Sequence, residues 1–212
     1  MSHPLWDQLA ADAGRTLAPE QSAALEQYLD LLTAGNEQMN LTRITDREQA
    51  RVQHVADALT LLPFLPAGAH RLADVGSGGG VPGVPLAIAR PDVRVTLIES
   101  IGKKAAFLEE SAAALGLANV HVFNGRAEAW RGGRFEVVAC RAVAALGKLV
   151  EWCRPLVAPG GVLLAMKGPR IAEELAEAAP VLRGQNARVE THPIRATALA
   201  GHVIAEIRWA GK

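Results

Sequence analysis

The spacing of apolar residues changes about a third of the way along the chain. Before that point, apolar residues recur every three or four positions, which predicts amphipathic helices. One helix is expected from Glu20 onward. Another begins near Asp46, which together with Gln49 resembles a capping box, and it ends at Pro63. We therefore predict that residues 1–66 form a helical extension packed on the main domain.

Residues 67–212 alternate between short apolar runs and helical patterns, which predicts one α/β domain. The expected strands are residues 71–75, 94–99, 119–124, 135–140 and 160–167. The expected helices are residues 82–90, 103–116 and 146–156. Such apolar strands are typical of a parallel sheet covered by helices on both faces. The C-terminal segments ARVETHPIRA and GHVIAEIRWA leave no room for a helix between them. We expect a hairpin there, and so an antiparallel last strand in a Rossmann-like, doubly wound fold.

A glycine-rich segment, DVGSGGGVPGVPLAI, follows the first expected strand and starts at Asp74. Read from Gly78, it matches the dinucleotide fingerprint G-x-G-x-x-G. Read from Asp74 through Gly76, it matches the acidic-x-G-x-G-x-G loop of methyltransferases that bind S-adenosylmethionine. Pro82 and Pro85 remove two N–H donors that a pyrophosphate would need. The Asp74 carboxylate suits the ammonium group of a methionine moiety, so the chemistry favours S-adenosylmethionine.

Glu99 ends the second expected strand. A carboxylate at this place can accept hydrogen bonds from both hydroxyl groups of a ribose. Both candidate cofactors contain an adenosine ribose, so Glu99 indicates a nucleoside cofactor without choosing between them.

Cations follow the carboxyl ends of four expected strands, where ligands of an open α/β sheet bind. Lys103 and Lys104 follow the second strand, Arg126 the third and Arg141 the fourth, and Lys167 closes the fifth. The whole chain is neutral, with 22 Lys and Arg against 22 Asp and Glu. Five cations on one edge therefore predict an anionic substrate, and a phosphodiester backbone fits.

The segment after the fourth expected strand, VVACRAVAA, lacks the Asp/Asn-Pro-Pro-aromatic motif of amine methylation. Cys140 is interpreted as a buried structural residue rather than a nucleophile, and neither a disulfide with Cys153 nor a metal site is expected. A ring nitrogen with a free lone pair, such as guanine N7, has no proton to lose. Its methylation needs no general base, only proximity and orientation.

The N-terminal residues MSHPLWDQLA lack the basic start and apolar stretch of a signal peptide. No uncharged apolar run approaches the roughly 20 residues of a membrane span. We expect a soluble, cytoplasmic protein that does not associate with membranes, and we expect it to be a monomer.

Seven segments occur in order along the chain: NLTRITD (40–46), HVADALTLLPFL (54–65), LADVGSGGGVPGVPLAIARPD (72–92), LIESIGKKAAFL (97–108), GRAEA (125–129), CRAVAAL (140–146) and MKG (166–168). Together they resemble the glucose-inhibited division protein B (RsmG) family of small-subunit ribosomal RNA guanine-N7 methyltransferases. The resemblance implies a class I methyltransferase that uses S-adenosylmethionine to methylate one guanosine in the 530 loop of 16S rRNA. We expect the substrate to be a small ribosomal subunit or an assembly intermediate, because a neutral chain attracts bare phosphate only modestly.

Specific residues follow from this resemblance and from the chemistry above. The resemblance implies cofactor-binding roles for Gly76, Val81, Ala127, Glu128 and Arg141. The chemistry of the glycine turn and the second strand adds Asp74, Gly78 and Glu99. The candidates for holding RNA or orienting the base are Arg126, Arg141 and Lys167, of which Arg141 and Lys167 are the catalytic candidates. Lys103 and Lys104 are candidates for outer phosphate contacts.

The chain departs from the family pattern at three places. Trp-Asn is replaced by Gly35-Asn36, Arg-His by Gln53-His54, and Ser-Arg-Ala by Cys140-Arg141-Ala142. His54 and Asp57 match family positions, and they are interpreted equally well as functional residues or as a helix-packing pair. Three other functions remain open: a methyltransferase for a small anionic metabolite, a nicotinamide-dependent oxidoreductase and a non-catalytic RNA-binding module.

Overall fold

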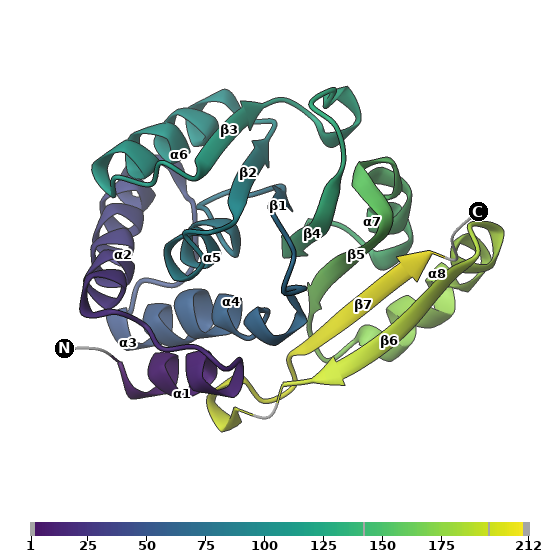
Figure 1. Cartoon of the computed structure of the whole chain (residues 1–212), viewed down its shortest axis with the longest axis horizontal. Coiled ribbons are helices and arrows are strands. Elements are labelled where there is room, and N and C mark those ends of the chain that lie inside the picture. Colours follow the sequence, from purple (N-terminus) through teal and green to yellow (C-terminus); the bar gives the residue numbers. More distant parts are fainter. Residues whose placement is uncertain (1–2, 142, 195, 210–212) are drawn as a thin grey trace.

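The computed structural model describes residues 3–141, 143–194 and 196–209. These residues form a seven-stranded sheet in the order β3-β2-β1-β4-β5-β7-β6 (Figure 1). The strands are β1 (Arg71–Val75), β2 (Arg94–Glu99), β3 (Val120–Asn124), β4 (Phe135–Arg141), β5 (Val157–Lys167), β6 (Ala187–Pro193) and β7 (Val203–Trp209). Strands β1 to β5 pair in parallel, whereas β7 runs antiparallel to β5 and β6. The predicted fold, including its antiparallel end, is confirmed.

Helices cover both faces of this sheet (Figure 1). They are α1 (Pro4–Asp12), α2 (Pro19–Met39), α3 (Arg47–Ala50), α4 (Asp57–Leu59), α5 (Gly83–Ala89), α6 (Gly102–Ala114), α7 (Leu146–Cys153) and α8 (Ile171–Gly184). Helices α1 to α6 share one hydrophobic core with one face of the sheet, and α7 and α8 share a second core with the other. Within the described ranges, no helix is long and apolar enough to cross a membrane.

The helix predicted from Asp46 forms, but it is not one uniform α-helix. The Asp46 side chain accepts a hydrogen bond from the Gln49 amide at 2.8 Å and so caps α3. A π-helical segment, η1 (Arg51–Ala56), then joins α3 to α4. A π-segment widens the helix and is frequent at functional sites.

Helices α1 and α8 were not predicted from the sequence pattern. Helix α8 contains Pro180 in its interior, which local reasoning disfavours because proline removes a hydrogen bond and crowds the preceding turn. Here Ala178 and Leu182 of α8 are buried in the second core, so tertiary packing stabilises the helix. The predicted C-terminal hairpin is present, with a short 3₁₀ turn (Thr197–Leu199) between its strands.

The N-terminal helices support the glycine turn that follows β1. The buried Tyr28 of α2 donates its hydroxyl hydrogen to the carbonyl oxygen of Gly79 at 2.8 Å. A Cβ at Gly79 would lie 2.7 Å from the Leu32 side chain, so α2 packs directly against the turn. Arg47 and Arg51 both pair with Glu26 and tie α2 to the segment that contains η1.

Gly35 stands where the family pattern has Trp, and the packing around it explains the difference. A Cβ at Gly35 would lie 2.6 Å from the ring of Phe107. The Phe107 ring from α6 therefore fills the space that a larger side chain at position 35 would need.

Candidate functional site

The turn between β1 and α5 exposes its backbone at the carboxyl edge of the sheet. Gly76, Gly78 and Gly80 have φ angles of 72°, 56° and 100°, in the left-handed region that favours glycine. A Cβ at Gly76 would also lie 2.7 Å from a methyl group of Val143. Val143 thus covers Gly76, and the half-buried backbone at Gly78 is the open part of the turn, where ligands of doubly wound sheets bind.

Asp74 lies beneath this turn and is fully buried. One carboxylate oxygen accepts a hydrogen bond from the Gly83 amide at 3.0 Å. The other oxygen, Oδ1, is buried and has no hydrogen-bond partner among the described residues. Burial raises the pKa of Asp74 to about 7. A buried acceptor without a partner is costly, and a nearby cationic group of a ligand would compensate for it.

Glu99 links the glycine turn to the start of α6. Its Oε2 accepts from the Gly78 amide and its Oε1 from the Ile101 amide, both at 2.8 Å. An ionised carboxylate has about four acceptor sites, so each oxygen can still accept a further hydrogen bond. Glu99 therefore retains the capacity to accept ribose hydroxyls while fixing the turn.

The residues that the resemblance assigned to the cofactor differ in exposure. Val81 is buried in the core that includes α2, so its side chain supports the turn from within. Ala127 is buried on a 3₁₀ turn after β3, and the adjacent Glu128 is exposed.

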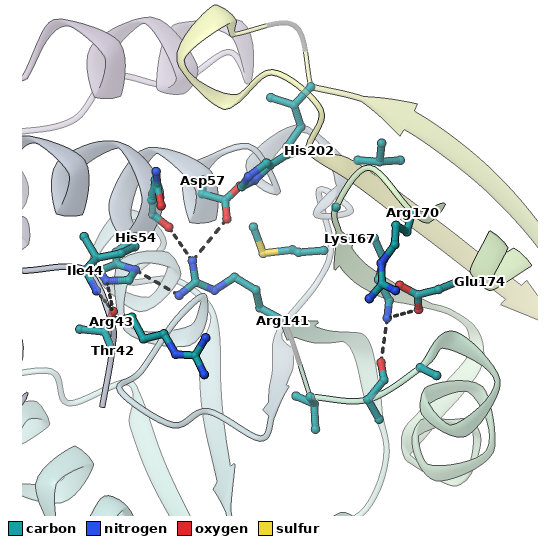
Figure 2. Close-up of a pocket in the computed structure, with 18 of the residues that line it drawn as sticks. Thr42, Arg43, Ile44, His54, Asp57, Arg141, Lys167, Arg170, Glu174 and His202 are labelled. Atoms are coloured by element: carbon teal, nitrogen blue, oxygen red, sulfur yellow. Dashed lines mark hydrogen bonds and ion pairs between the residues drawn. The ribbon is translucent and has the colours of Figure 1, made fainter. Parts of the chain in front are cut away.

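A cavity of about 690 Å³ lies at the carboxyl ends of β4 and β5 (Figure 2). Its lining comes from residues 42–44, from η1 and α4, from the ends of β4 and β5, from α8 and from the start of β7. It includes Arg141 and Lys167, but not the glycine turn, Lys103, Lys104 or Arg126. The five cations expected along one edge are therefore divided between this cavity and the cofactor side.

Arg141 crosses the cavity wall from the end of β4 to the η1 segment (Figure 2). Its Nη1 donates to the Gln53 carbonyl oxygen at 2.5 Å and lies 3.4 Å from Asp57 Oδ2. Its Nη2 lies 3.1 Å from Nδ1 of His54. These contacts join Arg141 to His54 and Asp57, which the sequence left open as either functional residues or a helix-packing pair.

The Lys167 side chain already bonds to other residues of the protein, which its position at the end of a strand did not suggest. Its Nζ donates to the Ala144 carbonyl oxygen at 2.8 Å and pairs with Glu174 Oε2 at 2.7 Å. The side chain is only 6% exposed. Lys167 therefore holds the loop after β4 in place against α8, and most of its hydrogen-bonding capacity is already used.

Sequence comparisons identify the family. The family model for rRNA small subunit methyltransferase G (GidB) matches residues 21–198. The chain belongs to this family. It is 53% identical to "Ribosomal RNA small subunit methyltransferase G" of Sorangium cellulosum over 188 residues, covering 85% of this chain and 78% of the relative. A relative of the same name from Neisseria gonorrhoeae is 46% identical over 158 residues, covering 74% of this chain and 76% of the relative.

Solved structures agree on the fold of this methyltransferase G family member. An O-methyltransferase from Bacillus cereus in complex with SAH matches with a TM-score of 0.62 and 15% identity, covering 95% of this chain and 97% of that chain. A ribosomal protein L11 methylase from Lactobacillus delbrueckii matches with a TM-score of 0.58 and 17% identity, covering 74% and 78%. At these identities the likeness supports the Rossmann-like class I methyltransferase fold.

Two cavity arginines were missed at the level of sequence. Arg43 and Arg170 are exposed, line the cavity and have no hydrogen-bond or ion-pair partner among the described residues. Figure 2 shows Arg43 beside His54 and Arg170 in front of Lys167. Arg43 precedes α3 and follows no strand, so a rule based on strand ends does not include it. Arg170 lies three residues after β5, closer to its strand than Lys103 and Lys104 are to β2, so the same rule should have included it. Their positions in the NLTRITD segment and just after MKG were the available signals.

The remaining predicted cations lie outside the cavity lining. Lys103 and Lys104 stand at the start of α6, and Arg126 is exposed after β3. Among the described residues, none of these three side chains has a hydrogen-bond or ion-pair partner, so all three remain available to an anionic ligand on the cofactor side.

Cys140 and Cys153 are both free and fully buried. A hydrogen bond with Cys153 and burial raise the pKa of the Cys140 thiol. A high thiol pKa disfavours the thiolate, which agrees with a structural role. In the described part of the chain, Glu190, His192 and Glu206 could together hold a metal ion, but they lie on the β6–β7 hairpin and do not line the cavity.

Proposed function

We propose that this chain transfers the methyl group of S-adenosylmethionine to N7 of one guanosine in the 530 loop of 16S rRNA. The observation that carries the proposal is a glycine turn at the carboxyl edge of the sheet, next to a cavity, in a member of the rRNA small subunit methyltransferase G family. The cavity lining holds four cations, Arg43, Arg141, Lys167 and Arg170, and four carboxylates, of which Asp57 pairs with Arg141 and Glu174 pairs with Lys167. Membership of the family supports methylation of small-subunit rRNA. The choice of N7 of one guanosine in the 530 loop is the part that we propose.

The cofactor side fits S-adenosylmethionine. The bare backbone at Gly78 permits close approach, and Glu99 can accept the ribose hydroxyls. The free oxygen of Asp74 suits the ammonium group of the methionine moiety. A pyrophosphate would instead place two negative charges near two carboxyl groups, so the donor set disfavours a dinucleotide.

The chemistry requires little from the protein beyond placement. The cofactor supplies an electrophilic methyl group on a positively charged sulfur. The lone pair of guanine N7 forms the new N–C bond as the C–S bond breaks, and no proton leaves the base. Arg141 offers N–H groups in the cavity that can orient the target nucleotide, and Lys167 fixes the loop after β4 beside it. Proximity and orientation can supply the acceleration.

RNA would be held by cations that have no partner in the described structure. Arg43 and Arg170 lie at the cavity, and Lys103, Lys104 and Arg126 lie along the adjoining edge. Arginine forks match phosphate geometry and lysine acts as a point charge. Because the formal net charge is zero, we infer that the natural substrate is a structured particle rather than bare RNA.

The test uses methyl-labelled S-adenosylmethionine and small ribosomal subunits that lack 7-methylguanosine. Protein-free 16S rRNA and bulk tRNA serve as comparison substrates, and label is mapped by base-specific cleavage at 7-methylguanosine. We expect label at one guanosine of the 530 loop in the subunits. No label on subunits, with cofactor binding intact, would contradict the proposal. Efficient labelling of protein-free RNA would contradict only the requirement for a particle.

A further inference from the structure

We propose that His54, Asp57 and His202 are positioning residues that hold the Arg141 guanidinium in one orientation at the cavity. This inference rests on the proposed function, because it assigns these residues to the same methyl transfer. None of the three has to touch the reacting atoms. They act by fixing which N–H groups of Arg141 face the substrate.

Arg141 retains free N–H donors after its contacts with the protein. A guanidinium has five N–H donors. The contacts to Gln53, Asp57 and His54 use three of them, so two of the five remain. The Arg141 side chain is 23% exposed, so these donors can reach a substrate oxygen in the cavity. Three fixed contacts on a planar group leave it little freedom to rotate.

His54 has one tautomer compatible with its partners. Burial and the Arg141 charge lower the pKa of His54 to about 4, so the ring is neutral at pH 7. Arginine cannot accept a hydrogen bond, so Nδ1 must be the acceptor and Nε2 must carry the proton. Nε2 then donates to Thr42 Oγ1 at 3.0 Å, and that oxygen also accepts from the Ile44 amide at 3.0 Å. The ring is fixed at both nitrogens.

Asp57 connects three separate parts of the chain. Its carboxylate is nearly buried, at 3% exposure, and pairs through Oδ2 with Arg141 from β4. Its Oδ1 lies 2.9 Å from Nδ1 of His202, which precedes β7. This hydrogen bond with Asp57 raises the pKa of His202. His202 thereby fixes the carboxylate that in turn fixes Arg141.

The backbone of η1 is also arranged around Arg141. In a regular α-helix, the Gln53 carbonyl would accept from the Asp57 amide four residues later. Here the Asp57 amide bonds to the carbonyl oxygens of Val52 and His54 instead. The Gln53 carbonyl oxygen instead accepts from the Arg141 guanidinium. The same guanidinium contacts the His54 ring and the Asp57 carboxylate, which lie on either side of it in Figure 2. A helix-packing pair alone would not require this departure from α-helical bonding.

Two substitutions of His54 separate positioning from packing. His54→Asn keeps an amide oxygen near the place of Nδ1, where it can accept from Arg141. His54→Gln carries its amide near the place of Nε2, where it can contact Thr42 but not replace Nδ1. We expect H54Q to lower kcat/KM for small subunits at least about tenfold and H54N to stay within about threefold of wild type. The Kd for S-adenosylmethionine should stay within about twofold in both.

His202→Ala has a matched control in His192→Ala. Each histidine pairs with a carboxylate at 2.9 Å near the hairpin, but His192 pairs with Glu206 and does not line the cavity. We expect H202A to lower kcat/KM by about three- to tenfold and H192A to leave it within about twofold. Equal losses in both variants, or losses in all variants that follow a fall in Tm, would overturn the inference.

The motion of the Arg141 guanidinium can be measured without RNA, so the positioning inference can be tested separately from the proposed methyl transfer. In ¹⁵N NMR spectra, we expect slow rotation of the Arg141 guanidinium in wild type and H54N, and faster rotation in H54Q. The Arg141 signal is assigned by its loss in R141K. If this pattern is seen but wild type labels no RNA, the positioning inference holds and the proposed function fails. If wild type labels RNA but the guanidinium is equally mobile in all variants, the positioning inference fails.

Discussion

The two sides of the carboxyl edge are built in different ways. On the cofactor side, one turn and the strands beside it supply the glycines, Asp74 and Glu99, and their hydrogen bonds go mostly to nearby backbone amides. On the cavity side, the side chains come from segments far apart in the chain, and Arg141, Asp57, His54 and His202 bond to one another. The Arg141–Asp57 and Asp57–His202 contacts span 84 and 145 residues of sequence.

This difference implies different responses to mutation. Changes on the cofactor side should alter binding of S-adenosylmethionine, and changes in the cavity should alter transfer or RNA binding with cofactor affinity intact.

Replacing Arg141 by Ala should separate the two sides most sharply. Loss of a charged donor that orients substrate should reduce kcat/KM for small subunits by about 10²- to 10³-fold. The resemblance also implies a cofactor contact for Arg141, but its guanidinium lines the cavity rather than the glycine turn. We therefore expect the Kd for S-adenosylmethionine, measured by calorimetry, to change by less than about threefold, and a larger change would support the cofactor contact. The exposed Arg188 of β6 is a matched control, and R188A should retain wild-type activity. Full activity of R141A would remove Arg141 from any essential role.

Replacing Glu99 by Ala should weaken binding of S-adenosylmethionine and leave methyl transfer at saturating cofactor largely intact. It removes the acceptor of the Gly78 and Ile101 amides and the proposed ribose contact. Hydrogen bonds to a charged group contribute about 1.5–3 kcal/mol each, so the Kd for S-adenosylmethionine should rise by about 100-fold. At saturating cofactor, kcat should recover largely. The exposed Glu110 of α6 gives the control E110A, whose Kd should match wild type. A large loss of kcat in E99A at saturating cofactor would argue against the separation.

Cofactor affinity should depend on pH through Asp74. The free protein holds this carboxyl at a pKa of about 7, above its ordinary value, so it is protonated on the acid side. A bound ammonium favours the carboxylate, so binding below pH 7 must release a proton. Affinity should therefore fall about fivefold as the pH drops from 7 to 6, and the slope should approach about tenfold per unit at lower pH. Calorimetry should show this slope in wild type and a flat profile in D74N. The same slope in D74N would assign the dependence to another group.

Removing the two free cavity arginines should give the smallest effects. R43Q and R170Q should each raise the KM for small subunits by about three- to fivefold and lower the salt dependence of binding by about one counterion. Neither should change the Kd for S-adenosylmethionine. Arg134, exposed at the amino end of β4, provides R134Q as a control of equal charge change. If R134Q behaved like the cavity variants, the effect would reflect general charge rather than these positions.

Much of the fold and the cofactor side followed from local sequence. The strand predictions agree with the structure to within three residues at each end, because apolar runs must be buried whatever their neighbours are. Gly76 and Gly78 were identified from the acidic-x-G-x-G-x-G pattern after the first strand, and Glu99 because it ends the second strand. The positive φ angles of both glycines in the structure explain why glycine stands there. These features depend on residues close together in the chain.

The cavity could not be read in the same way. The strand-end rule found Arg141 and Lys167 but could not show that Glu174 already neutralises Lys167. It missed Arg43, Arg170 and His202, which reach the site only through loops and the hairpin.

Residues close together in the chain were enough to predict the strands and the glycine turn, because apolar runs and glycine motifs are local features. The ordered motifs along the chain were enough to predict the family. Which cations are free and which are bound depended instead on contacts made only in the folded chain. Charges separated by 84 and 145 positions interact only after folding brings them within hydrogen-bond distance, and burial then strengthens each contact. The orientation of Arg141, on which the proposed chemistry depends, is therefore a property of the folded chain rather than of any one segment.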